Sequence, residues 1–418
     1  MNFSSKFPYK HIFFWILFIV LFSSGFVFFK TPFEFYFHYL FFLTITPIWI
    51  IKYGLPKIIF QILFVPLIIG LIHVSLNNNS LFTFIKIFGG ILLTLIFYHH
   101  TLSKYKFDVK KIFEWYIKFC YLLSLIGLFQ LISFLVGFDL GSDFSWFLNK
   151  WKLVEGGVVG IRVNSLLSEP TYLATSLAPA VYVSVKNLIS KNYLILKKYQ
   201  SIIILFVVVI TTSSIGYLGI LLSVLLCTKT IRLRYIGLGV FISIIGFGLA
   251  YNNVDDFKAR VDSAKGLWID NDFKISNTNN SSFVLYNNLH IAYKGLLTHP
   301  FFGTGLGSHE EVFKKYTLTK SLIKYDFEFN VKDGNSLFIR LCTETGIFGL
   351  IFILILIFKC FIYSTKYELE SYKVISQSLF ILLVLSLIRQ GNYMLNGLPL
   401  VFLLYYFNFV DYRKKIKI

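Results

Sequence analysis

The stretch from Gly160 to Ala174 places charged side chains where a polar segment enters a hydrophobic run. Arg162 carries a planar guanidinium that binds phosphate through two parallel hydrogen bonds. Glu169 precedes Pro170, which is best tolerated in a first helical turn, so we expect the carboxylate near the positive end of a helix. Partial desolvation there would raise its proton affinity toward that of a general base. The alternative is a carboxylate that only complements the helix dipole.

Two other segments combine small polar residues with glycine. Ser213 and Ser214 follow two threonines inside an apolar hairpin whose arms are too short for two full crossings, so its tip should lie below the membrane surface. The hydroxyls at this tip would either line a water-filled cavity or belong to small residues that let helices pack closely. In the second segment, from His299 to Ser308, glycine-rich backbone could expose N–H groups to an anion or form a tight turn. His299 could carry a proton or cap the preceding helix.

Composition indicates that lipid surrounds most of these segments. Hydrophobic residues make up 56% of 418 residues and the mean hydropathy is +0.69, which predicts an all-α polytopic integral membrane protein. The net charge of +19 does not indicate nucleic acid binding, because the lysines lie mostly in short loops between apolar runs. The four cysteines fall inside apolar runs without metal-like spacing, so we expect buried small hydrophobes and no disulfide framework. No metal site is predicted.

A window of about 20 residues predicts about twelve transmembrane spans. They lie near residues 11–29, 35–51, 58–76, 81–100, 112–136, 165–185, 200–211, 214–228, 234–251, 336–360, 374–390 and 393–410. Lysine-rich connections alternate along the chain, which predicts that both termini are cytoplasmic.

One large external loop should separate the ninth and tenth spans. The expected division is a membrane domain at 1–251, an external loop domain at 252–335 and a second membrane domain at 336–418. Within the loop domain, apolar spacing predicts an amphipathic helix from Ser282 to Thr298, capped by Ser281 or Ser282.

This topology places several arginines outside or at outer helix ends, where the positive-inside rule does not require them. Arg162, Arg340 and Arg389 would suit the pyrophosphate of a lipid carrier. Each could instead pair with a carboxylate, and Glu344 lies four residues after Arg340, on the same helix face.

The order of these motifs resembles the O-antigen ligase and polymerase superfamily, and within it the Wzy-type polymerases of lipid-linked oligosaccharide repeats. The resembling residues run from Arg162 to Ala174, from Thr211 to Gly216 and from His299 to Gly307, followed by Asn335-Ser336 and Gly346-Ile-Phe-Gly349. Family ligases carry a histidine at the position of Asn335, and this difference favours a polymerase.

The resemblance implies a metal-independent glycosyltransferase without cofactors that joins repeat units on undecaprenyl pyrophosphate at the external face of a bacterial inner membrane. It implies a lipid-linked oligosaccharide substrate, and a chain-length regulator and a flippase as partners. We expect Glu169, Arg162 and His299 in the reaction. The substrate-binding set would be Arg340, Arg389, Asn335, Glu344, Tyr172, Ser213 and Ser214. The alternatives are a ligase that passes polymer to another acceptor, and a polysaccharide flippase or transporter.

Overall fold

The computed structural model describes residues 9–31, 33–157, 159–190, 194–227, 245, 247–248, 251–253, 255–270, 279–319, 330–363 and 366–416. This part of the chain is mostly helical, with two small antiparallel sheets. Four helices are long and apolar enough to cross a membrane: α3 (Lys57–Ser75), α4 (Leu81–Lys104), α5 (Val109–Leu135) and α16 (Glu370–Arg389). The predicted all-α membrane class is confirmed at this level.

The expected twelve spans are not found among the described residues. Shorter apolar helices stand at several of the predicted positions: α1 (Tyr9–Phe22), α2 (Phe37–Tyr53), α8 (Lys198–Ile210), α9 (Ser214–Leu226) and α15 (Gly346–Lys359). The window at 11–29 overran α1, which ends at Phe22 before a Ser-Ser-Gly turn. The window at 336–360 merged α15 with α14 (Leu337–Glu344), although Gly346 has a positive φ of 61° between them. Most of the window at 234–251 lies outside the described residues.

Helix α7 (Pro170–Ser190) is enclosed by other helices. It packs against α5, α8, α9 and α16, and nearly all its side chains from Leu173 to Val185 are buried. A helix enclosed by other helices needs no lipid-like surface, which explains how α7 accommodates serines, threonines and an internal Pro179. Close contact with α9 depends on Gly216, where an added Cβ would lie 3.2 Å from Cβ of Ala174. Helix α17 (Leu398–Ile416) packs against α16 and α4.

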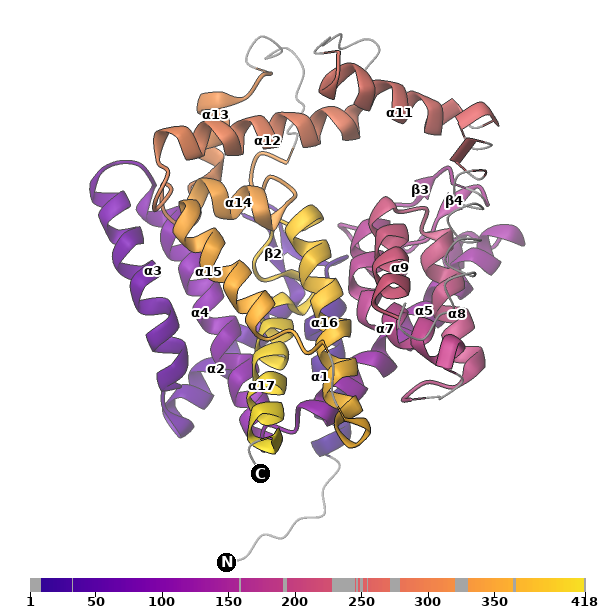
Figure 1. The fold of residues 1–418 in the computed structure, drawn as a ribbon, viewed down its shortest axis with the longest axis horizontal. Helices are drawn as coiled ribbons and strands as arrows, with labels where there is room; N and C mark the ends of the chain where they lie inside the picture. Colours follow the sequence, from indigo (N-terminus) through magenta and orange to yellow (C-terminus); the bar gives the residue numbers. More distant parts are fainter. Residues whose placement is uncertain are drawn as a thin grey trace, which may run out of the picture.

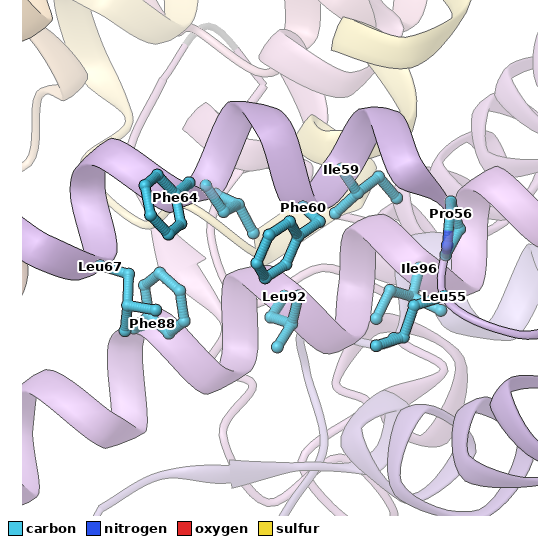
Figure 2. A pocket seen from close by; sticks show the side chains of 10 residues that line it. Leu55, Pro56, Ile59, Phe60, Phe64, Leu67, Phe88, Leu92 and Ile96 are labelled. Atoms are coloured by element: carbon cyan, nitrogen blue, oxygen red, sulfur yellow. The ribbon is translucent and has the colours of Figure 1, made fainter.

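The outer helices expose apolar side chains, as expected of a surface that faces lipid tails. Ile51 is 88% exposed and Val65 is 58% exposed. A protein surface that faces water rarely carries so many exposed apolar side chains together. Figure 2 shows a pocket of about 170 Å³ between α3 and α4, lined entirely by apolar residues that include Phe60, Phe64 and Phe88. This pocket offers no group that could do acid–base chemistry, so we do not place the site there.

The polar elements gather at one end of the molecule, opposite the C-terminus (Figure 1). Helices α11 (Asp255–Trp268), α12 (Asn280–Thr298) and α13 (His309–Tyr316) lie across this end, and α12 and α13 pack on α14. Helix α12 confirms the predicted amphipathic helix, although it begins at Asn280 rather than at a serine cap. The lysine-rich end of α17 lies on the opposite side.

Two short hairpins and a single helical turn complete this end. Strand β1 (Val27–Phe29) pairs with β2 (Phe35–Tyr36), and β3 (Val154–Glu155) pairs with β4 (Ile161–Arg162). The turn is α6 (Asp139–Ser142). Asn149 ties the first hairpin to the loop between α6 and β3, because its side chain accepts a hydrogen bond from the Val27 N–H at 2.9 Å and donates one to the Val27 carbonyl at 2.5 Å.

Candidate functional site

Glu169 lies directly before α7, and its carbonyl oxygen accepts the first hydrogen bonds of that helix from Tyr172 (3.1 Å) and Leu173 (3.2 Å). The side chain is exposed. Desolvation by the surrounding protein nevertheless raises the pKa of the Glu169 carboxyl, and the negative charge of Asp333 raises it further. Arg389, Lys150 and Arg162 act in the opposite direction. The Glu169 carboxylate is therefore accessible to solvent, although charged groups and partial desolvation affect its pKa.

Arg162 reaches this environment from β4. Its Nε donates to the carbonyl oxygen of Thr211 at 3.2 Å, at the end of α8. Thr212 has a positive φ of 44°, which turns the chain back into α9. The arms α8 and α9 have 13 residues each, about 20 Å at 1.5 Å per residue, short of a hydrocarbon core of about 30 Å. The predicted short hairpin is confirmed, with Ser213 buried and Ser214 exposed at its tip.

Arg389 ends α16, and the head of α14 is fixed to the same place. Ser336 caps α14 by accepting from the Ile339 N–H, and its hydroxyl donates to the Leu387 carbonyl at 2.7 Å. Arg340 donates from Nη1 to the Gly391 carbonyl at 2.9 Å. These contacts on both sides of Arg389 hold α14 against the end of α16.

The guanidinium of Arg340 is committed to neighbouring protein groups. Its Nε donates to Glu344 Oε1 at 2.7 Å, and its Cζ lies 4.2 Å from the centre of the Tyr393 ring. The Tyr393 hydroxyl donates to the other Glu344 oxygen at 2.9 Å. Arg340 is 3% exposed and Glu344 0%. The ion pair that the four-residue spacing predicts is present, and both of its side chains are buried.

Lys150 is a cation of this site that the sequence did not single out. It forms a salt bridge with Glu34 from the loop before β2, donates to the Tyr36 hydroxyl, and lies over the Tyr36 ring at 4.6 Å from its centre. Burial raises the pKa of Glu34, but the hydrogen bonds from Lys150 and Tyr36 outweigh it, so the pKa is lowered overall. Tyr172 lies within electrostatic reach of Glu34 and Glu169.

Asp333 is a second group that the sequence did not identify. Its Oδ1 accepts the Asn335 N–H at 3.0 Å, in a turn where Asn335 has a positive φ of 50°. Desolvation raises the pKa of Asp333, while the Asn335 hydrogen bond and the charges of Arg340 and Lys150 lower it in part. The backbone N–H of the predicted residue Asn335 thus binds Asp333, whose charge acts on Glu169.

The glycine-rich segment is a packing element between α12 and α14. The N–H groups of Thr304 and Gly305 donate to the carbonyls of Thr343 and Glu344, at 3.0 and 2.9 Å. Gly303 has a positive φ of 65°, and an added Cβ there would lie 2.5 Å from the Glu344 carbonyl carbon. These N–H groups close the end of α14, as a structural turn would, and are not directed at an anion.

His299 lies beside α3 and has no described contact with the charged residues around Glu169. Its ring centre is 6.4 Å from that of His73, in an edge-on contact. Its backbone N–H continues α12 by donating to the Gly295 carbonyl at 2.9 Å. No described contact links His299 to Glu169.

The structure therefore brings Arg162, Arg389 and Tyr172 within electrostatic reach of Glu169. It leaves Arg340 and Glu344 bound to each other, and His299 beside His73 of α3. Lys150, Glu34 and Asp333 come from loops distant in sequence, so spacing could not associate them with Glu169. Two signals were nevertheless present: Lys150 is a cation in the polar stretch that precedes Arg162, and Asp333-Gly334 is a typical turn sequence.

Among the described residues, no three His, Cys, Asp or Glu side chains are grouped to hold a metal ion. All four cysteines are free and buried, as predicted. Comparison with protein-family models and with curated proteins finds no match to this chain.

Proposed function

We propose that this chain is an integral membrane glycosyltransferase that polymerises oligosaccharide repeat units carried on undecaprenyl pyrophosphate. The observation that carries the proposal is that three cations, Arg162, Arg389 and Lys150, act electrostatically on the Glu169 carboxylate at the start of α7, in a bundle whose apolar helices could cross a membrane. Guanidinium groups beside a carboxylate suit a reaction in which a hydroxyl loses a proton while a pyrophosphate leaves.

In the proposed reaction the growing chain is the donor. A sugar hydroxyl of the incoming unit attacks the anomeric carbon of the chain, and Glu169 takes the hydroxyl proton. The bond from the anomeric carbon to the pyrophosphate breaks, and the electron pair leaves with undecaprenyl pyrophosphate. Arg162 and Arg389 stabilise the charge on that group. The activated bond travels with the substrate, so no nucleotide sugar is consumed.

The polar end would then face outward from a bacterial inner membrane, with both termini inside. Lysine placement supports this orientation, because the end of α17 opposite the site carries Lys414 and Lys415. A flippase that delivers repeats and a regulator of chain length are the partners this reaction would need. Arg340 and Glu344 act here through α14, by fixing its head beside Arg389.

The test replaces the base and one cation in the source bacterium. We expect Glu169→Gln to lower the polymerisation rate about 10²–10⁴-fold, the usual contribution of a general base, and Arg162→Ala to lower it about 10²–10³-fold. Gel analysis of surface polysaccharide should show single repeats instead of long chains, at normal protein levels.

Two exposed positions in the same external loop serve as matched controls: Glu155→Gln and Lys152→Ala should leave chain length unchanged. Normal polymer in both Glu169→Gln and Arg162→Ala would contradict the proposal. Polymer of normal length stranded on its lipid carrier would indicate a ligase instead, and loss of every surface repeat with accumulation inside would indicate a transporter.

A further inference from the structure

Helix α3 is the least buried of the four helices that could cross a membrane. Among the described elements it packs mainly against α4. The two helices meet closely at Gly70, where an added Cβ would lie 2.0 Å from Cε2 of the Phe84 ring. Helices in a membrane associate through close packing, and lipid chains cover the surfaces that no other helix reaches. Lipid is therefore the main neighbour of α3 on its other faces.

A crevice lies between α3 and α4 on the N-terminal side of Gly70. It is the pocket of about 170 Å³ in Figure 2, and its lining residues fall within residues 55–67 and 88–96. All the lining side chains are apolar, and Phe60 and Phe64 are 55% and 46% exposed, so the crevice is open at the surface of the bundle. An apolar crevice of this kind offers no hydrogen bond to water or sugar, whereas a hydrocarbon chain needs none.

The Leu55 end of the crevice lies on the side of the molecule opposite the polar helices. After α3, Asn79 donates from Nδ2 to the Leu306 carbonyl at 2.7 Å, which places the turn between α3 and α4 beside the glycine-rich segment. The 19 residues of α3 span about 28 Å at 1.5 Å per residue. The first residue of α3, Lys57, therefore lies on the other side, where α17 ends (Figure 1).

Two exposed lysines flank this end of the crevice. Lys52 lies in the last turn of α2, and Lys57 is the first residue of α3. Phe60 lines the crevice three residues after Lys57, so both side chains lie on the same face of α3. The short connection between the lysines is fixed to α4, because Nε2 of His100 is hydrogen-bonded to the Gly54 carbonyl oxygen at 3.1 Å. Basic residues beside a pocket between membrane helices are typical of sites for anionic lipid heads.

We propose that the crevice between α3 and α4 binds one chain of an anionic phospholipid, whose head lies between Lys52 and Lys57. The chain alone gives little selectivity, because it leaves surroundings as apolar as the crevice. The lysines supply the selectivity: each raises the affinity for an anionic head about fivefold, which corresponds to about 1 kcal/mol. The inference does not depend on the proposed function, which places the substrate pyrophosphate at the opposite end, with Arg162 and Arg389.

The first test removes the two positive charges. Binding to the full chain in detergent is measured by native mass spectrometry, with phosphatidylglycerol and phosphatidylcholine of equal chain length as probes. The wild-type chain should prefer phosphatidylglycerol, and Lys52→Gln with Lys57→Gln should weaken its binding about 25-fold without changing that of phosphatidylcholine. The matched control is Lys106→Gln with Lys110→Gln, which removes the same charge from exposed positions where α4 connects to α5. It should keep the preference.

The second test fills the crevice. Leu92→Trp places a larger side chain among the lining residues and should weaken the binding of both lipids about fivefold or more. Ile85→Trp is its control, because Ile85 is 58% exposed on the same helix and does not line the crevice. If Leu92→Trp unfolds, Leu67→Trp on the α3 side is measured in the same way. The lysine variants change only exposed side chains, so they remain informative in either case.

Several results would overturn the inference. One is equal affinity of the wild-type chain for the two lipids, and another is an unchanged preference in Lys52→Gln with Lys57→Gln. Loss of the preference in the Lys106→Gln and Lys110→Gln control would show a general charge effect rather than a site. Undecaprenyl phosphate that binds more tightly than phosphatidylglycerol, and is displaced by Leu92→Trp, would make the substrate carrier the occupant. A dimer that Leu92→Trp dissociates would make the crevice an interface between copies. None of these results bears on Glu169, so the proposed function is tested separately.

Discussion

At the scale of single residues, the site separates charges that face outward from charges that are satisfied internally. Glu169 is exposed, and three cations act electrostatically on its carboxylate. Arg340 and Glu344 are buried and bind each other. The two groups contain the same types of charged residue, and they differ only in their burial and in their partners. Burial of a paired charge does not by itself stabilise a fold, but loss of one partner leaves the other charge unpaired in a low-dielectric interior.

We therefore expect Arg340→Met alone to destabilise the protein by about 3–5 kcal/mol, seen as a lower melting temperature in detergent and less protein in the membrane. The double variant Arg340→Met with Glu344→Leu should recover much of that loss, because no buried charge is left. Tyr393→Phe, which removes one hydrogen bond to Glu344, should cost about 1.5–3 kcal/mol. A fully stable Arg340→Met protein that makes only single repeats would instead show that the Arg340 charge acts on substrate.

At the scale of elements, the break between α14 and α15 determines where α14 points. Gly346 has a positive φ of 61°, and the first N–H groups of α15 donate to the glycine-rich segment: Ile347 to the Pro300 carbonyl at 2.8 Å and Phe348 to the Phe301 carbonyl at 3.2 Å. The loop and the break thus satisfy each other's backbone groups, as a buried helix end requires.

Gly346→Ala tests this junction. The new Cβ would lie 2.6 Å from backbone atoms of Phe301 and Gly303, in a backbone region that costs a non-glycine residue about 1–2 kcal/mol even without a clash. We expect Gly346→Ala to lower the free energy of unfolding by more than about 2 kcal/mol in total. Gly89→Ala is the control, because nothing lies within 4 Å of its added Cβ in α4, and alanine favours a helix by about 1 kcal/mol. Equal melting temperatures for the two variants would show that the junction yields easily.

The same elements show what sequence can predict here. Apolar periodicity located α12, short apolar runs located the α8–α9 hairpin, and four-residue spacing identified the Arg340–Glu344 pair, because each depends on neighbours along the chain. The break at Gly346 was missed because a hydropathy window averages over a single residue. The Lys150–Glu34 pair joins positions more than a hundred residues apart, so no local pattern could reveal it.

At the scale of the whole molecule, the proposed reaction requires that α13 and the end of α17 lie on opposite sides of the membrane. Their separation in the fold supports this (Figure 1), and the lysines in the last turn of α17 predict which side is cytoplasmic. The native cysteines are free but buried, so the wild-type chain should give little background with a membrane-impermeant thiol reagent.

We expect Lys315→Cys in α13 to react with such a reagent in intact cells, and Lys415→Cys at the end of α17 to react only after the membrane is opened. Both positions are exposed, so accessibility to solvent does not distinguish them and the membrane alone decides the result. Mass spectrometry of the labelled protein gives the measurement. Labelling of Lys415→Cys but not Lys315→Cys in intact cells would place Glu169 on the cytoplasmic side. Nucleotide sugars would then be available to the site, and a donor carried on undecaprenyl pyrophosphate would no longer be required.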